Sequence, residues 1–187
     1  MAYGSYTGTN SNNNISFGSI IGVYNQTIVN PYSGYSIVVS LVDANINNTI
    51  YDGRGGNDTI LMSVANDVLT LVDDNGAVML TSVEEFNTGS GIDIIIIAHS
   101  TVNYGPVVIR GAEGDDILWT NSGDDVVSGG LGNDIIDGGG GNDFIVGGEG
   151  DDYISGGLGI DTLIGGEGDD TIDYSIDGTW SFGITLE

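Results

Sequence analysis

Residues 111–173 decide the fold. They divide, without an insertion or deletion, into seven nonapeptide repeats: GAEGDDILW, TNSGDDVVS, GGLGNDIID, GGGGNDFIV, GGEGDDYIS, GGLGIDTLI and GGEGDDTID. Position four is always Gly, position six is always Asp, and position eight is always Leu, Val or Ile. Nine residues are too few for a helix with its connection, but they suit a turn of six residues followed by a strand of three. The sequence therefore predicts a repeated turn–strand unit.

The alternation of side chains along a strand assigns a direction to each position. Position eight lies on one face of the strand triplet, and positions seven and nine lie on the other. We expect the aliphatic position eight to point inward and positions seven and nine to point outward. Glycines at positions one, two and four are expected to permit positive φ and close approach between turns. Two repeats would close one coil, so the turns would stack in two columns about 4.8 Å apart.

The Asp residues of position six form two ladders in this arrangement. One column holds Asp116, Asp134, Asp152 and Asp170, and the other holds Asp125, Asp143 and Asp161. Stacked carboxylates repel one another, and residues 111–173 contain sixteen acidic residues and no Lys or Arg. An external cation is therefore expected. Carboxylate and carbonyl oxygens favour Ca²⁺, and the absence of Cys, with a single His, argues against zinc or copper.

With these residues the array resembles the RTX (repeats-in-toxin) family, strongly over 111–173 and patchily before it. The resemblance implies an all-β fold, a right-handed parallel β-roll or β-helix solenoid of GGxGxDxUx nonapeptides, with Asp side chains and turn carbonyls as Ca²⁺ ligands. Counting the gaps between stacked turns predicts about five Ca²⁺ ions. Besides the ladder Asp residues, the predicted ligands are the glycines at positions two and four of repeats three to seven: Gly130, Gly132, Gly139, Gly141, Gly148, Gly150, Gly157, Gly159, Gly166 and Gly168.

The first two repeats depart from the pattern. Ala112 and Asn121 replace Gly at position two, and Thr120 replaces Gly at position one. We expect calcium sites that use Asp116 or Asp125 to be weaker or empty. The alternative for the whole array is a disordered acidic tail, but such tails lack an aliphatic residue locked to one position of the repeat.

The chain before and after the array predicts three further parts. Residues 1–50 are an Asn-rich β cap, with expected strands at Ile15–Tyr24, Thr27–Val29 and Tyr35–Val42; the alternative is a flexible leader. Residues 51–110 are a degenerate entry to the solenoid. Residues 174–187 are a C-terminal cap built on Tyr174, Trp180 and Phe182, and the alternative there is a secretion signal.

The entry segment contains two further candidate calcium ligands. Asp58 lies at position six of GRGGNDTIL, and Asp93 lies at position six of a segment that resembles those preceding RTX arrays in bacterial surface proteins. Asp67 follows Asp58 by nine residues, in a turn without glycines. Val68–Val72 and Ala77–Thr81 flank Asn75-Gly76 and predict a β-hairpin. Gly105–Ile109 is expected to form a coil that stacks without calcium.

Composition limits the classes of function. A net charge of −25 and a pI near 4.1 exclude nucleic acid as a partner. The chain has no Lys, so Schiff-base chemistry and a Walker phosphate loop are also excluded. His99 is the one histidine of the chain, and the sequence contains neither an HExxH motif nor a G-x-S-x-G motif. The sequence predicts a protein that is not an enzyme.

The sequence also predicts where the protein works. The N-terminus has neither the basic nor the apolar region of a signal peptide, and no apolar run is long enough to span a membrane. We expect a secreted bacterial protein, extracellular or on the cell surface, without an N-terminal signal peptide; the RTX resemblance implies type I secretion. The short segment after the array favours a fragment of a longer protein. The start at Met1, with no catalytic domain before the array, argues against the secretion module of an RTX enzyme.

Two functions follow. The first is a calcium-folded structural or adhesive module, such as an element of a surface layer, filament or adhesin. The alternative is the secretion and folding module of a larger type I-secreted RTX enzyme. An outward apolar face formed by Val126, Phe144, Val146 and Ile164 suggests self-association, although β-branched residues also simply suit short strands. No direct membrane insertion is expected.

Overall fold

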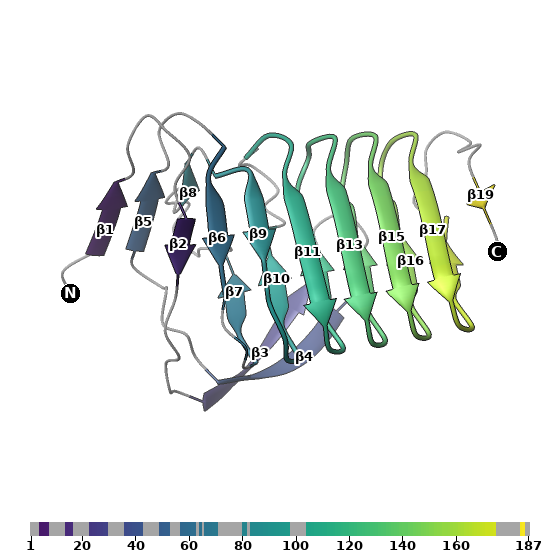
Figure 1. Ribbon diagram of the computed structural model, residues 1–187, viewed down its shortest axis with the longest axis horizontal. Helices are drawn as coiled ribbons and strands as arrows, with labels where there is room; N and C mark the ends of the chain where they lie inside the picture. The colour runs from purple at the N-terminus through teal and green to yellow at the C-terminus, as the bar shows by residue number, and fades with distance from the viewer. Residues whose placement is uncertain are drawn as a thin grey trace.

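Stacked parallel strands form most of the structure, a computed structural model that describes residues 4–7, 14–16, 23–29, 36–42, 49–52, 57–62, 64, 66–70, 80–81, 83–97, 104–174 and 184–185. Figure 1 shows the strands side by side along one long axis. Over these ranges every regular element is a strand. None of the described residues forms a helix long and apolar enough to cross a membrane.

Two parallel sheets build the solenoid. The eight-stranded sheet runs in the order β19-β17-β15-β13-β11-β9-β6-β2 and the six-stranded sheet in the order β18-β16-β14-β12-β10-β7. The first contains β2 (Asn14–Ser16), β6 (Thr59–Leu61), β9 (Glu85–Asn87), β11 (Val108–Glu113), β13 (Val126–Leu131), β15 (Phe144–Glu149), β17 (Thr162–Glu167) and β19 (Ile184–Thr185). The second contains β7 (Val68–Thr70), β10 (Ile94–Ile96), β12 (Ile117–Trp119), β14 (Ile135–Asp137), β16 (Tyr153–Ser155) and β18 (Thr171–Asp173).

From β9 to β18 the chain alternates between the two sheets, so one strand of each makes a coil. Within the array, partners in neighbouring coils are 18 residues apart, which is two nonapeptides. The predicted all-β solenoid of stacked parallel strands is confirmed. Coils of the entry segment are longer: the corresponding separations are 23 and 26 residues. The extra residues lie between the strands, so the register of the strands is kept.

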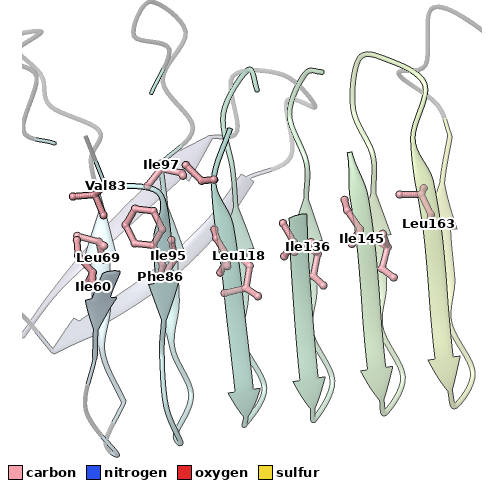
Figure 2. Close-up of a cluster of buried hydrophobic side chains, with 14 residues drawn as sticks. Ile60, Leu69, Val83, Phe86, Ile95, Ile97, Leu118, Ile136, Ile145 and Leu163 are labelled. Carbon is pink, nitrogen blue, oxygen red and sulfur yellow. The ribbon is translucent and has the colours of Figure 1, made fainter. Parts of the chain in front are cut away.

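Position eight of every complete coil points inward, as the alternation predicts. Ile145 of β15 and Ile136 of β14 are fully buried, and the core continues into the entry through Phe86 and Ile95. Figure 2 shows these side chains in line between the two sheets. Burying each such side chain contributes about 1.5–3 kcal/mol relative to exposure. The array gains one such residue per nonapeptide, which accounts for the strict aliphatic pattern.

The expectation that position nine lies on the outer surface is wrong for three strands of the six-stranded sheet, β12, β14 and β16. There Trp119 and Ser155 are each 1% exposed and Asp137 is 4% exposed. The Asp137 side chain bends back to its own turn, where Oδ1 accepts a hydrogen bond from the N–H of Gly139 at 2.9 Å. A residue next to the turn can satisfy its polar atoms locally, and simple alternation ignores this. On the eight-stranded sheet, Val126 and Phe144 at position seven are exposed as predicted.

The N-terminal strands are β-rich, but part of them joins the solenoid. β2 pairs in parallel with β6, and β1 (Gly4–Thr7) pairs with β5 (Thr49–Asp52) in a three-stranded sheet that ends in β8 (Leu80–Thr81). β3 (Val23–Val29) and β4 (Ser36–Val42) form an antiparallel pair of their own. The pairings of β1 and β2 therefore cross the boundary expected at residue 50. The division into four parts stays a prediction.

The predicted hairpin around Asn75-Gly76 is wrong. β7 pairs with β10, whereas β8 pairs with β5, so the two flanking strands belong to different sheets. A local turn signal is outweighed here by parallel stacking, which uses Leu69 as a fully buried core residue. The turn residues themselves, like His99, Trp180 and Phe182, lie outside the described residues. At the C-terminal end, β19 continues the eight-stranded sheet by pairing with β17.

Candidate metal centre

Each ladder Asp uses one carboxylate oxygen to join its coil to the preceding one. The N–H of Asp134 donates to Oδ1 of Asp152 at 2.8 Å, and the N–H of Asp116 donates to Oδ1 of Asp134 at the same distance. The second column repeats this pattern from Asp125 through Asp143 to Asp161. Position six is therefore both donor and acceptor in a continuous chain of hydrogen bonds along the solenoid.

The second carboxylate oxygen is buried and has no hydrogen-bond partner in the part of the chain that the structure describes. This holds for Oδ2 of five ladder residues and of one residue in the entry: Asp116, Asp125, Asp134, Asp143, Asp152 and Asp93. A buried carboxylate oxygen without a partner is strongly unfavourable. Its repetition in successive coils indicates that each coil is built around something other than protein atoms.

Burial has a large effect on the acidity of the ladder. It raises the pKa of Asp116 and of Asp143 to about 8 and that of Asp134 to about 7. Hydrogen bonds from the preceding coil partly oppose this rise, and neighbouring ladder carboxylates add to it. Asp161 shifts in the same direction because of burial. Without a cation, the ladder holds its negative charge only at a cost in stability.

The glycine at position one faces each partnerless oxygen. A Cβ added to Gly129 would lie less than 3.0 Å from Oδ2 of Asp134 and from the carbonyl oxygen of Gly147 in the next coil. The same two kinds of oxygen face the Cβ positions of Gly111, Gly138 and Gly147. We call this space, lined by an Asp Oδ2 and the carbonyl of the next position-one glycine, a cradle. Four complete cradles lie in the array.

Position-one glycines were missed as site residues in the sequence analysis, which assigned them positive φ. Only the glycines at positions two and four adopt it in the complete repeats, for example Gly148 with φ 132° and Gly150 with φ 129°. A Cβ at Gly148 would also collide with the carbonyl oxygen of Gly130, one coil earlier. Positions two and four are thus glycine for conformation and stacking, whereas position one is glycine because the cradle needs the space.

A second hydrogen-bonded ladder, at position five, was also missed. Here a side-chain oxygen accepts from the position-five N–H of the next coil: Oδ1 of Asp115 from Asn133, Oδ1 of Asn133 from Asp151, and Oδ1 of Asp151 from Asp169, at 2.7–2.8 Å. Asp124 and Asn142 do the same in the other column. The signal in the sequence is that position five is Asp or Asn in every repeat except the sixth, which has Ile160.

The two columns differ in the entry segment. The first continues backwards through Asp93 and Asp67: Oδ1 of Asp93 accepts from the N–H of Asp67 at 2.6 Å. The second is interrupted at Val107, whose N–H donates to Oδ1 of Asp125 and which has no carboxylate of its own. The coil predicted to stack without calcium lies there, and its Ile109 is fully buried.

Asp58 belongs to the second column beyond this interruption. It is fully buried, and its N–H donates to Oε2 of Glu84, which takes the place of a ladder Asp. The sequence did not reveal this equivalence, because the residue is Glu instead of Asp. In addition, the separation in this coil is 26 residues, which is not a multiple of nine.

The donor set of the array fits a hard cation. Within the described ranges, no three His, Cys, Asp or Glu side chains converge on one point. A cation in a cradle would therefore take Asp Oδ2 and turn carbonyls as ligands, an all-oxygen set typical of Ca²⁺. The charge of the ladders also favours a bound cation. Arg110, the one described cationic side chain of this region, pairs with Glu85 and does not neutralise a ladder carboxylate.

Comparison with protein families agrees with this geometry. The description of the RTX calcium-binding nonapeptide repeat, in its four-copy form, matches residues 110–145 and again residues 146–177. Residues 110–177 are RTX calcium-binding repeats. A search of curated proteins finds no match to the chain.

The RTX repeats bind Ca²⁺, and the module that they form is structural rather than catalytic. RTX repeats occur in secreted proteins. The matched residues contain all four cradles. Ala112, which replaces Gly at position two of the first RTX repeat, is the one described non-glycine residue with positive φ, at 73°. The first RTX repeat thus keeps the turn conformation in spite of the substitution.

Proposed function

We propose that the protein is a calcium-folded structural or adhesive module that works outside a bacterial cell. The observation that carries the proposal is the repetition of a buried, partnerless Oδ2 in successive coils. Seven stacked acidic repeats without Lys or Arg cannot hold these charges by themselves. Ca²⁺ outside the cell would neutralise them, so metal binding and folding would be one event.

The proposed ligands are the ladder Asp residues, from Asp116 to Asp170, together with the turn carbonyls of the RTX repeats. The carbonyls predicted from the sequence belong to glycines at positions two and four, and the cradles add the position-one carbonyls of Gly129, Gly147, Gly156 and Gly165. Asp58 and Asp93 are the candidate ligands of the entry, and both are fully buried, but the Asp93 coil has Thr88 where a cradle has glycine.

The direct test is a titration of the full chain with Ca²⁺, from EGTA to about 10 mM, followed by far-UV circular dichroism and sedimentation. We expect a cooperative transition to β structure with a midpoint around 10⁻⁴–10⁻³ M, as for other extracellular calcium modules. Mg²⁺ should be inactive, because it demands near-ideal octahedral geometry and dehydrates reluctantly. A chain that is fully folded in EGTA would overturn the proposal.

A second candidate function is the secretion and folding module of a larger type I-secreted enzyme. It rests on the same observation, because a chain that stays unfolded in the calcium-poor cytosol can pass a narrow exporter and fold outside. The sedimentation measurement in the calcium titration distinguishes the two candidate functions. A calcium-dependent increase in mass favours a self-assembling structural protein, whereas a calcium-folded monomer favours a module of a larger protein.

The proposed contact for self-association is the face formed by Val126, Phe144, Val146 and Ile164. Val126 is 43% exposed and Phe144 is 44% exposed, on neighbouring strands of the eight-stranded sheet. Replacing Phe144 and Val146 by Ser should abolish the increase in mass and leave the calcium-induced dichroism unchanged. Thr162→Ser, on the next strand of the same sheet, is the matched control. An unchanged mass in the double variant would exclude this face.

A further inference from the structure

Two position-one residues next to a ladder Asp are threonine instead of glycine. Thr120 occupies position one of the second RTX repeat, five residues before Asp125, and Thr88 stands five residues before Asp93. Both threonines are fully buried. Their Cβ atoms and hydroxyl groups therefore occupy the space that the four glycine cradles leave open.

The hydroxyl groups make the contact that closes this space. Oγ1 of Thr120 donates to the carbonyl oxygen of Gly138 at 2.5 Å, and Oγ1 of Thr88 donates to the carbonyl oxygen of Gly111. In each case the acceptor is the position-one carbonyl of the next coil, the same oxygen that lines a glycine cradle. The Thr120 hydroxyl also lies beside Asp125, and the Thr88 hydroxyl lies beside Asp93.

We propose that Thr88 and Thr120 close their coils to calcium, so that no ion binds at Asp93 or Asp125. The threonine hydroxyl donates a hydrogen bond to the carbonyl oxygen whose lone pairs would otherwise coordinate a cation. This oxygen is therefore not available as a calcium ligand. The inference rests on the proposed calcium-dependent function, because it says which gaps of the ladder take the ion and which do not.

The number of ions follows. The gaps between stacked turns predict about five, three in the column of Asp116 and two in that of Asp125. Thr120 closes the gap between Asp125 and Asp143, which leaves four sites, one at each complete cradle: Gly111, Gly129, Gly138 and Gly147. At Gly156 and Gly165, the three atoms nearest to an added Cβ all belong to the Asp of the same repeat, so we do not count these end positions as complete cradles.

Thr88 precedes all four cradles, and Thr120 lies between the cradle of Gly111 and that of Gly129. Together with Val107, which interrupts the second column without a carboxylate, the threonines leave Gly111 as the one cradle of the described chain before residue 129. Residues 83–119 carry the largest buried side chains, Phe86 and Trp119. This segment would present a folded end on which the later calcium-dependent coils add one after another.

The test counts the Ca²⁺ ions bound per full-length chain, by equilibrium dialysis and atomic absorption at saturating calcium. We expect four for the original chain, five for Thr120→Gly, which opens a cradle, and three for Gly138→Thr, which closes one. Gly138 lacks positive φ, so Thr is compatible with its backbone conformation, and the added side chain meets Oδ2 of Asp143 and the carbonyl oxygen of Gly156. Thr120→Val keeps the filled space without the hydroxyl donor. It should bind four ions and show a lower midpoint of thermal unfolding than Thr120→Ser.

The outcomes separate this inference from the proposed function. If the original chain binds no Ca²⁺, the proposed function fails. If it binds Ca²⁺ but Thr120→Gly and Gly138→Thr leave the count unchanged, the closure by threonine is wrong and the proposed function stands. Should Thr120→Gly not fold, the Gly138→Thr count decides by itself, since an unchanged number there contradicts the inference.

Discussion

Glycine serves two different purposes within one nine-residue repeat. At position two, Gly148 has a φ of 132° and no room for a Cβ against the preceding coil. At position one, Gly147 has no such conformation, and a Cβ there would meet Oδ2 of Asp152 and the carbonyl of Gly165. Substitutions at the two neighbouring positions should therefore fail for different reasons, one in folding and the other in calcium binding.

Gly148→Ala should lower the free energy of unfolding in saturating calcium by roughly 2–3 kcal/mol, because the region of φ and ψ that it needs is almost confined to glycine. The matched variant is Ala112→Gly, which relieves a left-handed non-glycine residue and should be neutral or stabilise by up to about 1 kcal/mol. Urea unfolding at fixed calcium measures both. Equal stability of Gly148→Ala and the original chain would contradict the assignment of position two.

The ladder carboxylates predict how stability depends on pH without calcium. Their folded-state pKa values are raised above the ordinary 3.8, to about 6 for Asp152 and about 8 for Asp143, mainly by burial. Groups shifted this way stabilise the fold fully below their unfolded pKa and lose that contribution as pH rises through the folded values. In EGTA, far-UV dichroism should show more β structure at pH 5 than at pH 8.

Excess calcium should remove most of this dependence, because it binds the ionised form of the carboxylates. A calcium-free chain that is less ordered at pH 5 than at pH 8 would show that the ladder carboxylates are not the groups that limit folding.

The individual strand contributes little by itself and depends on its neighbours. A strand such as β14, of only three residues, is held by parallel partners on both sides and by ladders at both positions five and six of its turn. The position-five ladder lies on the surface, so its hydrogen bonds should each contribute about 0.5–1.5 kcal/mol, the ordinary net value. The buried position-six ladder needs the cation as well.

Asn133→Ala removes the acceptor for the N–H of Asp151 and should lower the free energy of unfolding by about 1 kcal/mol in calcium. Asp151→Asn is the matched control, since it keeps an acceptor for Asp169 and removes one negative charge. It should be neutral or slightly stabilising. Thermal unfolding of the two variants decides, and a greater loss in Asp151→Asn would show that charge, not hydrogen bonding, is what position five supplies.

The elements of the array could be predicted because their signals are strictly periodic, whereas those of the entry could not. Ile136 and Ile145 followed from position eight alone. The hairpin at Asn75-Gly76 was wrong because coils of 23 and 26 residues hide the equivalence of β7 with β10 from any count of nine. Glu84 was missed as a ladder member for the same reason. The sequence argument missed the space at position one, because it explained all glycines by positive φ and by close approach between turns.

The whole molecule combines a metal-free end with a metal-dependent end. Its net charge of −25 is concentrated where the coils stack most closely, so self-repulsion opposes compaction until cations bind. Each bound ion adds its own stabilisation, and because every coil packs only on its neighbours, ions and coils should add together. The central claim is that the coils with glycine cradles exist only with calcium, whereas the entry does not need it.

Hydrogen exchange of the full chain, resolved along the sequence by mass spectrometry, tests this claim most directly. In saturating Ca²⁺, the ladder N–H groups of Asp116, Asp134, Asp143 and Asp152 should be strongly protected, because each donates to the carboxylate of the next coil. In EGTA at pH 8, the account predicts that residues 129–173 exchange like an unfolded chain, while residues 83–97 keep measurable protection. Equal protection of residues 129–173 with and without calcium would contradict it.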